Sequence, residues 1–332
     1  MRDASTPLVI AHRGASGHRP EHTRAAYQVA IELGARAIEP DIVPTRDGVL
    51  VLRHENEISG TTDVADRPEF ADRRTTKEFL GQRLTGWFTE DFTWAELQTL
   101  RARERLPQLR PGSAAFDGTE PLLRLEDLLS MLEAAPRELT LVAELKHASY
   151  FESIGLPLHE LVPDALARWA GRDRLVVESF EQTVLGQVRA RGLEAEYVFL
   201  AEAEGAPADL LLRDGASARS YADHLTDEGL ARLAAEVDGV SPSKVLLLDG
   251  AGTTDLIARA KAAGLRTYTW TLRPENSFLA EAHRRGDDPA AYGDWRTEFG
   301  LILATGVDGV FADHPELMLE LLGEGGAVGG RA

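Results

Sequence analysis

Short apolar runs alternate with helical patterns along almost the whole chain, and this alternation constrains the fold more than any other feature. Eight runs have the length and composition of buried strands, and amphipathic helical patterns lie between them. Alternating strands and helices predict a parallel sheet covered by helices. Eight such units predict an α/β fold of the (β/α)8 TIM-barrel class. The candidate strands are 8–11, 36–42, 140–145, 174–179, 195–200, 238–242, 266–271 and 308–312. The helical patterns lie near 24–34, 125–134, 158–171, 181–191, 226–237, 253–263 and 314–322.

A further apolar run at 49–53 is not counted among the eight strands. Asp47 and Gly48 precede it, and this pair predicts a two-residue hairpin that turns 49–53 back antiparallel to the second strand. An open, doubly wound sheet is the alternative architecture for the same alternation. The Rossmann glycine fingerprint is absent, however, and this favours the barrel.

The length of 332 residues fits one barrel domain, because barrels of this class often carry insertions. We assign 1–322 to this single domain. The segment of about 55–122 is too long for an ordinary connection, and we expect it to form a small insertion over the barrel mouth. Within it, Thr93 and Glu96 form a capping-box pattern, which predicts a helix that runs to about Arg103.

Two other segments lie outside the repeating pattern. Residues 272–300 include Tyr292 and Trp295 together with several charges, and we expect this extended segment at the rim of the barrel. The glycine-rich residues 323–332 predict a disordered tail.

Composition narrows the range of partners. A formal net charge of −18 argues against nucleic acid and against stable association with anionic membranes. The absence of cysteine excludes disulfides and thiol catalysis. No run is long enough for a membrane span. The first strand follows Met1 closely without a signal-peptide core, so we expect a cytoplasmic location for the chain as written, or export if a signal has been removed.

Three carboxylates stand where strands end. Glu39 and Asp41 are two positions apart on one strand and therefore face the same side. Glu144 is placed in the same way on another strand. Such carboxylates repel unless a cation lies between them, and oxygen ligands without cysteine or clustered histidine favour Ca²⁺ or Mg²⁺. The alternative is that these acids pair with arginines.

Fixed cations and imidazoles occur at the same strand ends. Arg13 has the planar fork that suits a phosphate, although pairing with Glu21 is a competing role. Lys146 shares a face with Glu144 and could hold a phosphoryl oxygen or orient the carboxylates, unless it is a surface lysine. His12 and His54 end the first strand and the hairpin arm, and imidazoles there can donate or accept protons near neutral pH. His22 is expected as a hydrogen-bonding residue at the rim.

Taken in order, the motifs resemble the glycerophosphodiester phosphodiesterase family, and the segment Thr62–Asp66 resembles the longer bacterial branch of that family. The resemblance covers nearly the whole chain. It is carried by Leu8–Thr23, Ile38–Ile42, Asp47–His54, Ala143–Lys146, Glu178–Phe180, Thr269–Thr271 and Gly309–Asp313.

This resemblance implies metal-dependent hydrolysis of glycerophosphodiesters to sn-glycerol 3-phosphate and an alcohol such as choline or ethanolamine. The expected partner is thus a small-molecule phosphodiester. The implied site residues are His12 and His54 as the acid–base pair, Glu39, Asp41 and Glu144 as ligands of Ca²⁺ or Mg²⁺, and Arg13, Lys146, Phe180 and Trp270 as substrate contacts.

Some details remain open at this point. Core packing is an equally good explanation of Phe180 and Trp270. Glu55 stands where the family usually has Asp, which leaves the orientation of the His54 ring in question. A phospholipase D-like hydrolysis of lysophospholipid or sphingomyelin on the same barrel is one alternative function. A non-catalytic phosphodiester-binding barrel is another, although a binder needs no proton donor. The assignment of His12 as base and His54 as acid is a working hypothesis.

Overall fold

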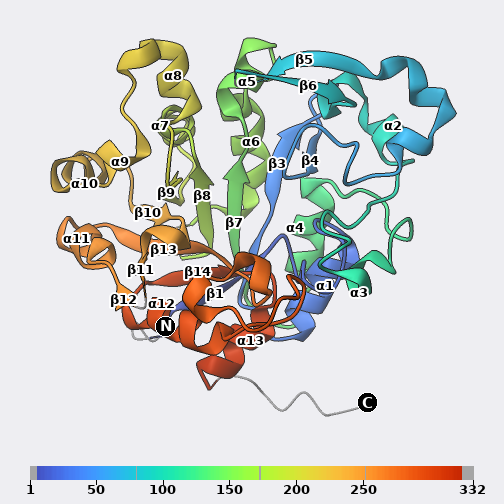
Figure 1. Cartoon of the computed structure of the whole chain (residues 1–332). Coiled ribbons are helices and arrows are strands. Elements are labelled where there is room, and N and C mark those ends of the chain that lie inside the picture. The colour runs from blue at the N-terminus through green and yellow to red at the C-terminus, as the bar shows by residue number, and fades with distance from the viewer. Residues whose placement is uncertain (1–5, 80, 172, 251, 324–332) are drawn as a thin grey trace.

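The computed structural model describes residues 6–79, 81–171, 173–250 and 252–323. Its centre is a closed parallel barrel with helices between the strands (Figure 1). Hydrogen bonding between β1 and β14, β1 and β2, and β2 and β7 closes the ring. The predicted (β/α)8 barrel is therefore confirmed. The barrel strands are β1 (Leu8–His12), β2 (Ala37–Glu39) continued by β3 (Asp41–Pro44), β7 (Thr140–Leu145), β8 (Leu175–Ser179), β9 (Glu196–Ala201), β10 (Gly239–Pro242), β13 (Arg266–Leu272) and β14 (Gly309–Ala312).

The second barrel strand, predicted as continuous over 36–42, is interrupted at Pro40. Proline has no N–H to give to the ladder, so the strand is divided into β2 and β3. Both pieces keep the same register on β7, with Ile38 opposite Leu141 and Asp41 opposite Glu144. The interruption therefore does not change which side chains face the barrel interior.

The predicted hairpin follows β3. Strand β4 (Leu50–Leu52) pairs antiparallel with β3. The turn is longer than predicted, because the Thr45 N–H donates to the Val49 carbonyl and leaves residues 46–48 as a three-residue turn. Gly48 has φ +76°, which is the left-handed conformation that such turns require at their last position.

Apolar side chains fill the interior of the barrel below its mouth. They form a separate buried cluster of Ile10, Ala37, Val142, Val176, Val198, Tyr268 and Phe311. Successive side chains of a strand point to opposite faces, so the residue two positions later lies in the next interior layer. This layer receives the apolar Leu200 together with His12, Glu39, Glu144, Glu178, Trp270 and Asp313. Strand periodicity thus brings polar groups to one end of the barrel.

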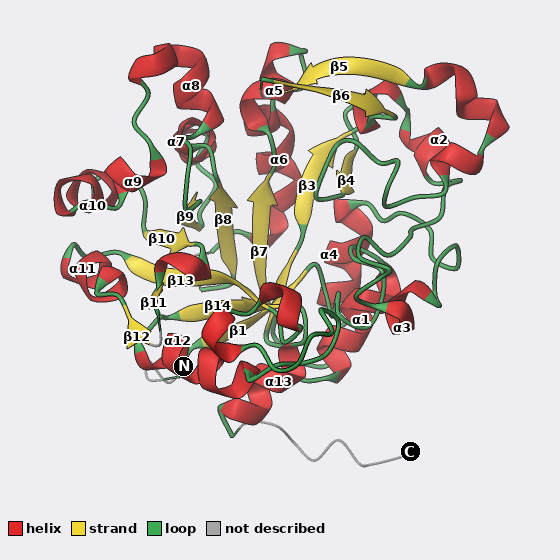
Figure 2. Ribbon diagram, viewed as in Figure 1, coloured by secondary structure: helices red, strands yellow, loops and turns green. Residues whose placement is uncertain are grey.

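The predicted helices are present with small changes at their ends, and Figure 2 shows them packed around the sheet. They are α1 (Arg24–Glu32), α4 (Leu125–Glu133), α6 (Leu158–Leu166), α7 (Gln182–Ala190), α10 (Asp227–Ala234), α11 (Leu256–Ala262) and α13 (Pro315–Leu321). Shorter elements occupy the loops: α5 (Ala148–Ser153), η4 (Ala167–Trp169), α8 (Ala208–Asp214), η5 (Gly215–Ser217), α9 (Tyr221–His224), η6 (Lys244–Leu246), β11 (Leu248–Asp249), β12 (Gly252–Thr253), η7 (Asn276–Phe278) and η8 (Glu281–His283). Among the described residues, none of the helices combines the length and apolar character needed to cross a bilayer.

One predicted extended segment is partly helical. The last part of 272–300 begins α12 (Trp295–Ala304), so the expectation of an extended chain is wrong there. The Asp294 side chain caps this helix by accepting from the Thr297 N–H. Its buried face consists of Trp295, Glu298, Phe299 and Ile302. The predicted tail at 323–332 lies, apart from Gly323, outside the described residues.

The insertion between β4 and α4 reaches the carboxyl ends of the barrel strands. Figure 1 shows its β5–β6 ribbon beside α5, at the end toward which β3, β7 and β8 point. It contains η1 (Val64–Asp66), η2 (Pro68–Arg73), β5 (Thr75–Phe79), β6 (Gln82–Gly86), η3 (Thr89–Asp91), α2 (Trp94–Leu97) and α3 (Pro111–Ala114).

The predicted capping box in this insertion is formed, but its helix is shorter than expected. Thr93 and Glu96 cap α2, which ends at Leu97 rather than near Arg103. Further along, Arg101 and Ala102 form β-bridges with Pro121 and Thr62. Tertiary pairing of this backbone therefore replaces the continuation of the helix.

Candidate active site

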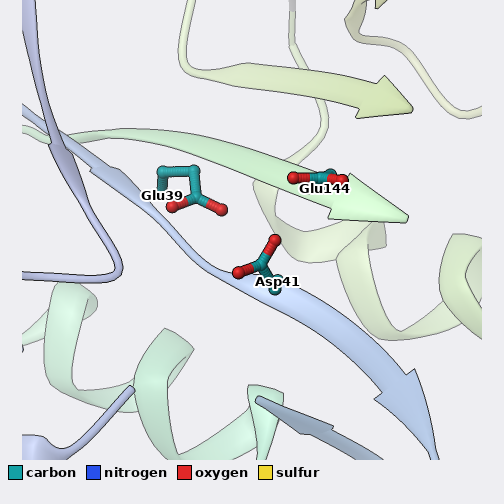
Figure 3. A group of neighbouring side chains, drawn as sticks. All are labelled: Glu39, Asp41 and Glu144. Atoms are coloured by element: carbon teal, nitrogen blue, oxygen red, sulfur yellow. The ribbon is translucent and has the colours of Figure 1, made fainter. Parts of the chain in front are cut away.

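Three buried carboxylates converge at the mouth of the barrel. Glu39 ends β2, Asp41 begins β3, and Glu144 lies near the end of β7 (Figure 3). Each offers an oxygen within 4.8 Å of those of the other two. Oε1 of Glu39 and Oδ1 of Asp41 accept no hydrogen bond from any described residue. The structure thus brings together the three acids that the sequence singled out.

The electrostatics of these carboxylates favour a cation among them. Burial, together with the charge of Asp41, raises the pKa of Glu39 well above its usual value. Burial and the same neighbour raise the pKa of Glu144 to about 8. The positively charged side chains nearby therefore neutralise only part of the negative charge of these carboxylates. An all-oxygen donor set with unsatisfied lone pairs fits a hard divalent cation such as Ca²⁺ or Mg²⁺.

Lys146 lies against the carboxylates. It follows β7 directly and is only 5% exposed, which rules out a surface lysine. Its Nζ is 2.8 Å from Glu144 Oε1 and 3.7 Å from Asp41 Oδ1. The same ammonium is 5.4 Å from the centre of the Phe180 ring. Lys146 is thus placed both to orient the acids and to present positive charge to the mouth.

Arg13 connects the first loop to the carboxylates. Its guanidinium lies 3.0 Å from Glu21 through Nη1 and 3.0 Å from Asp41 through Nε. Its backbone N–H donates to Glu39 Oε2 at 2.8 Å. Arg13 and Gly14 both adopt positive φ, and a Cβ on Gly14 would lie 2.6 Å from the backbone of Ala26. The pairing with Glu21 is therefore present together with a contact to the acidic cluster.

His12 is held by an aspartate from the last strand. Nδ1 of His12 lies 2.6 Å from Oδ1 of Asp313, which follows β14. Burial would raise the pKa of Asp313, but Arg273 and Arg110 hold it well below its usual value, so it is ionised. An ionised carboxylate only accepts, and Nδ1 of His12 must therefore carry the ring proton. Burial and the charge of Arg13 lower the pKa of His12 to about 4, which leaves the ring neutral at pH 7.

His54 has a corresponding partner in Glu55. Its Nδ1 lies 2.7 Å from Glu55 Oε1, while Oε2 of the same carboxylate lies 3.2 Å from Nε2 of His147. Burial and the charges of Arg13 and Lys146 hold the pKa of His54 well below its usual value. The charge of Arg13 lowers the pKa of both imidazoles, so His12 and His54 lie near the same guanidinium. Glu55 is thus close to the His54 ring, but Nδ1 forms no well-aligned hydrogen bond to any described residue.

An aromatic wall borders this polar region. The rings of Phe180 and Trp270 meet edge to face at 5.4 Å, and Phe180 meets Tyr221 in the same way at 6.4 Å. The Trp270 indole N–H donates to the Ser241 carbonyl. Phe180 and Trp270 keep part of their surface exposed and therefore can contact a ligand.

Some residues of the site were missed or misplaced by sequence reasoning. His22 is not at the rim: it is 1% exposed, and its Nε2 lies 2.9 Å from Asp41 Oδ2. Glu178 is the register partner of Glu144 and is also 1% exposed. Glu178 and Asp313 each follow an interior apolar residue by two positions, so strand periodicity could have identified both.

The insertion contributes two arginines that no motif indicated. Arg105 donates to both carboxylate oxygens of Glu21. Arg110 donates to Asp313 and to Glu275, the latter in the loop after β13. The insertion therefore contacts the two acids that pair with Arg13 and His12.

Neutral imidazoles beside fixed cations, at the carboxyl end of a barrel, suit hydrolysis of an anionic ester and define the class of phosphodiester-hydrolysing barrel enzymes. Residues 12–317 match the model of the glycerophosphoryl diester phosphodiesterase family. The chain belongs to this family, which confirms the resemblance of its motifs and its assignment as an enzyme.

Individual relatives agree with this assignment. Glycerophosphodiester phosphodiesterase GDPD6 of Arabidopsis thaliana is 31% identical over 93% of this chain and 84% of its own length. The glycerophosphodiester phosphodiesterase of Caldanaerobacter subterraneus subsp. tengcongensis is 23% identical over 96% of this chain and 99% of its own.

Solved structures share the fold. An Oleispira antarctica phosphodiesterase in complex with the product sn-glycerol-3-phosphate has a TM-score of 0.64 at 20% identity, covering 96% of this chain and 97% of the other. The glycerophosphodiester phosphodiesterase of Agrobacterium tumefaciens has a TM-score of 0.56 at 17% identity, covering 95% and 100%.

Proposed function

We propose that this enzyme hydrolyses glycerophosphodiesters to sn-glycerol 3-phosphate and a free alcohol, with a divalent cation and an acid–base pair of histidines. The observation that carries the proposal is the convergence of Glu39, Asp41 and Glu144 beside two cations and two neutral imidazoles. The Oleispira antarctica phosphodiesterase, which has the same fold, is in complex with sn-glycerol-3-phosphate, and this supports the product.

The cation would be held by Glu39, Asp41 and Glu144, whose buried oxygens fit a hard ion. When bound, Ca²⁺ or Mg²⁺ would neutralise phosphoryl charge and make a nearby hydroxyl more acidic. Arg13 and Lys146 would add fixed positive charge at the phosphoryl oxygens. Phe180 and Trp270 would pack against the glycerol part of the substrate.

His12 acts as the base in this proposal. Asp313 accepts from Nδ1 of His12, so the lone pair is on Nε2, and the lowered pKa keeps it available at neutral pH. Nε2 would take the proton of the attacking hydroxyl. This is either the 2-hydroxyl of the glycerol, which would give a cyclic phosphate for water to open, or a water molecule.

His54 acts as the acid that protonates the departing alkoxide. The positive charges of Arg13 and Lys146 oppose its protonation. A bound phosphodiester anion would offset those charges and raise the pKa of His54, so that the ring gains its proton when substrate is present. Glu55 at Nδ1 would stabilise the resulting imidazolium.

The test is product identification with and without metal. Chelator-treated enzyme should not release sn-glycerol 3-phosphate from glycerophosphocholine, and added Mg²⁺ or Ca²⁺ should restore release. Lysophosphatidylcholine assayed in parallel distinguishes the phospholipase D-like alternative. Tight binding of glycerophosphocholine without turnover in any metal would contradict the proposal and indicate a binding protein.

A further inference from the structure

We propose that Arg110, contributed by the insertion, is a positioning residue that fixes Asp313 and thereby the ring of His12. The inference rests on the proposed function, in which His12 is the base. It assigns to the insertion a part in the chemistry, although no residue of the insertion touches the carboxylate cluster in the interactions described above.

The guanidinium of Arg110 is held on three sides. Nη2 donates to Asp313 Oδ2 at 2.6 Å, Nε donates to Glu275 Oε1 at 2.8 Å, and Nη1 donates to the Ser16 carbonyl at 3.2 Å. Arg110 is only 7% exposed. A planar group with three partners in different directions has little freedom to rotate, so it gives Oδ2 of Asp313 a fixed donor.

Fixing one oxygen of Asp313 also fixes the other. Oδ2 accepts from Arg110 and from Nε of Arg273, at 2.7 Å, while Oδ1 is left for Nδ1 of His12. The two arginines therefore set the plane of the carboxylate, and that plane sets the direction and tautomer of the imidazole. Among the described donors to Oδ2, removal of Arg110 would leave only Arg273, whose side chain is 22% accessible.

This role makes a prediction that a purely structural role does not. Misorientation of a base lowers kcat, whereas substrate binding by the cations and aromatic residues should continue. Arg110→Ala should lower kcat for glycerophosphocholine about 10- to 100-fold with little change in KM. Guanidinium chloride at low millimolar concentration should restore part of that loss, because the free ion can occupy the vacated position. It should not rescue His12→Ala.

The matched control is Arg103→Met, which removes an arginine of the same insertion that pairs with Asp66 at the surface. It should retain wild-type kcat and show no response to guanidinium. Wild-type kcat in Arg110→Ala, or a loss confined to KM, would overturn the proposal. If Arg110→Ala does not fold, Arg110→Lys takes its place: one ammonium cannot reach all three partners, so kcat should still fall, and an unchanged kcat would count against the inference.

A substrate-free measurement separates this inference from the proposed function. ¹⁵N NMR of the His12 ring should show the Nδ1–H tautomer in the wild type and a mixture of tautomers in Arg110→Ala. An enzyme that failed to hydrolyse any glycerophosphodiester would contradict the proposed function, yet this tautomer shift would still be expected. The same tautomer in both proteins would show that Arg110 does not position His12.

Discussion

The ammonium of Lys146 lies 2.8 Å from Oε1 of Glu144, two positions earlier on the same strand face. Even with this cation beside it, the pKa of Glu144 is raised to about 8, because burial and the charge of Asp41 outweigh the attraction. Lys146 therefore compensates only part of the negative charge that the barrel mouth gathers. The remainder is what a divalent cation would neutralise.

Replacing Glu144 should weaken cation binding directly. Glu144→Gln keeps the shape of the side chain but removes one charged oxygen ligand, so affinity for Mg²⁺ or Ca²⁺ should fall at least about 10-fold. Isothermal titration of chelator-treated protein measures this. Glu152→Gln, on the exposed face of α5, is the control and should bind as the wild type does. Equal affinity in both variants would exclude Glu144 as a ligand.

The two imidazoles should each be needed for turnover. His12→Ala and His54→Ala should lower kcat for glycerophosphocholine about 10²- to 10⁴-fold, the usual contribution of one acid or base. Circular dichroism should show that both variants fold. His159→Ala, on the outer helix α6, serves as the control. Wild-type turnover in either site variant would remove that histidine from the mechanism.

Glu55 should act through the orientation and charge of His54. Glu55→Gln keeps the length of the side chain but removes the charge that stabilises a protonated ring, so kcat should fall about 10-fold. Glu55→Asp keeps the charge and restores the residue usual in the family, and should lose less activity. Steady-state kinetics should compare kcat of Glu55→Gln with kcat of Glu55→Asp. A larger loss in the aspartate variant would mean that geometry matters more than charge.

His22 should make the protein sensitive to acid. Its pKa in the folded protein is lowered to about 4 by burial, from the ordinary 6.5. A lowered histidine pKa contributes stability that is complete above pH 6.5 and is lost as pH falls toward 4. Between pH 7 and pH 5 this corresponds to about 2 kcal/mol of unfolding free energy.

His22→Asn should reduce this sensitivity, because an amide can still donate to Asp41 and does not titrate. Melting temperatures at pH 7 and pH 5 should therefore differ less in the variant than in the wild type. His159→Asn, whose ring is not enclosed in this way, should leave the difference unchanged. Identical pH dependence in wild type and His22→Asn would show that other groups control the acid response.

Trp270 should contribute to substrate binding if it contacts the glycerol part. Trp270→Ala should raise KM for glycerophosphocholine several-fold with a smaller effect on kcat. The reason is that the ring packs against the substrate but takes no part in proton transfer. Trp270→Phe should retain most of the affinity, since it keeps an aromatic face toward Phe180. An unchanged KM together with a lower melting temperature would instead assign Trp270 to core packing.

The sequence predicted most of the barrel because buried parallel strands read as continuous apolar runs. His12 and Glu144 were singled out because they stand at the ends of such runs, and the two-residue spacing of Glu39 and Asp41 placed both on one face. The helix α12 was missed because its apolar face is interrupted by charges and it follows a long irregular segment. The end of α2 was missed because Arg101 and Ala102 pair with distant backbone, which local capping signals do not reveal.

The supporting residues of the site were harder to predict for a similar reason. Arg110 and Asp313 are 203 positions apart, and neither lies in a pattern that refers to the other. The contact of His22 with Asp41 likewise depends on how the first loop folds over β3. Spacing along one strand locates groups that face the mouth, but it does not show which distant side chain holds each of them in place.

The anchoring of the insertion through Arg105 and Arg110 has a consequence for protein engineering. A chimera that received residues 55–122 from another barrel would lose one partner each of Glu21, Glu275 and Asp313 unless both arginines were reproduced. The segment therefore cannot be exchanged as an independent module. Recombination across this boundary should succeed when both arginines are kept, or when the donor's own loops after β1, β13 and β14 are transferred along with the segment.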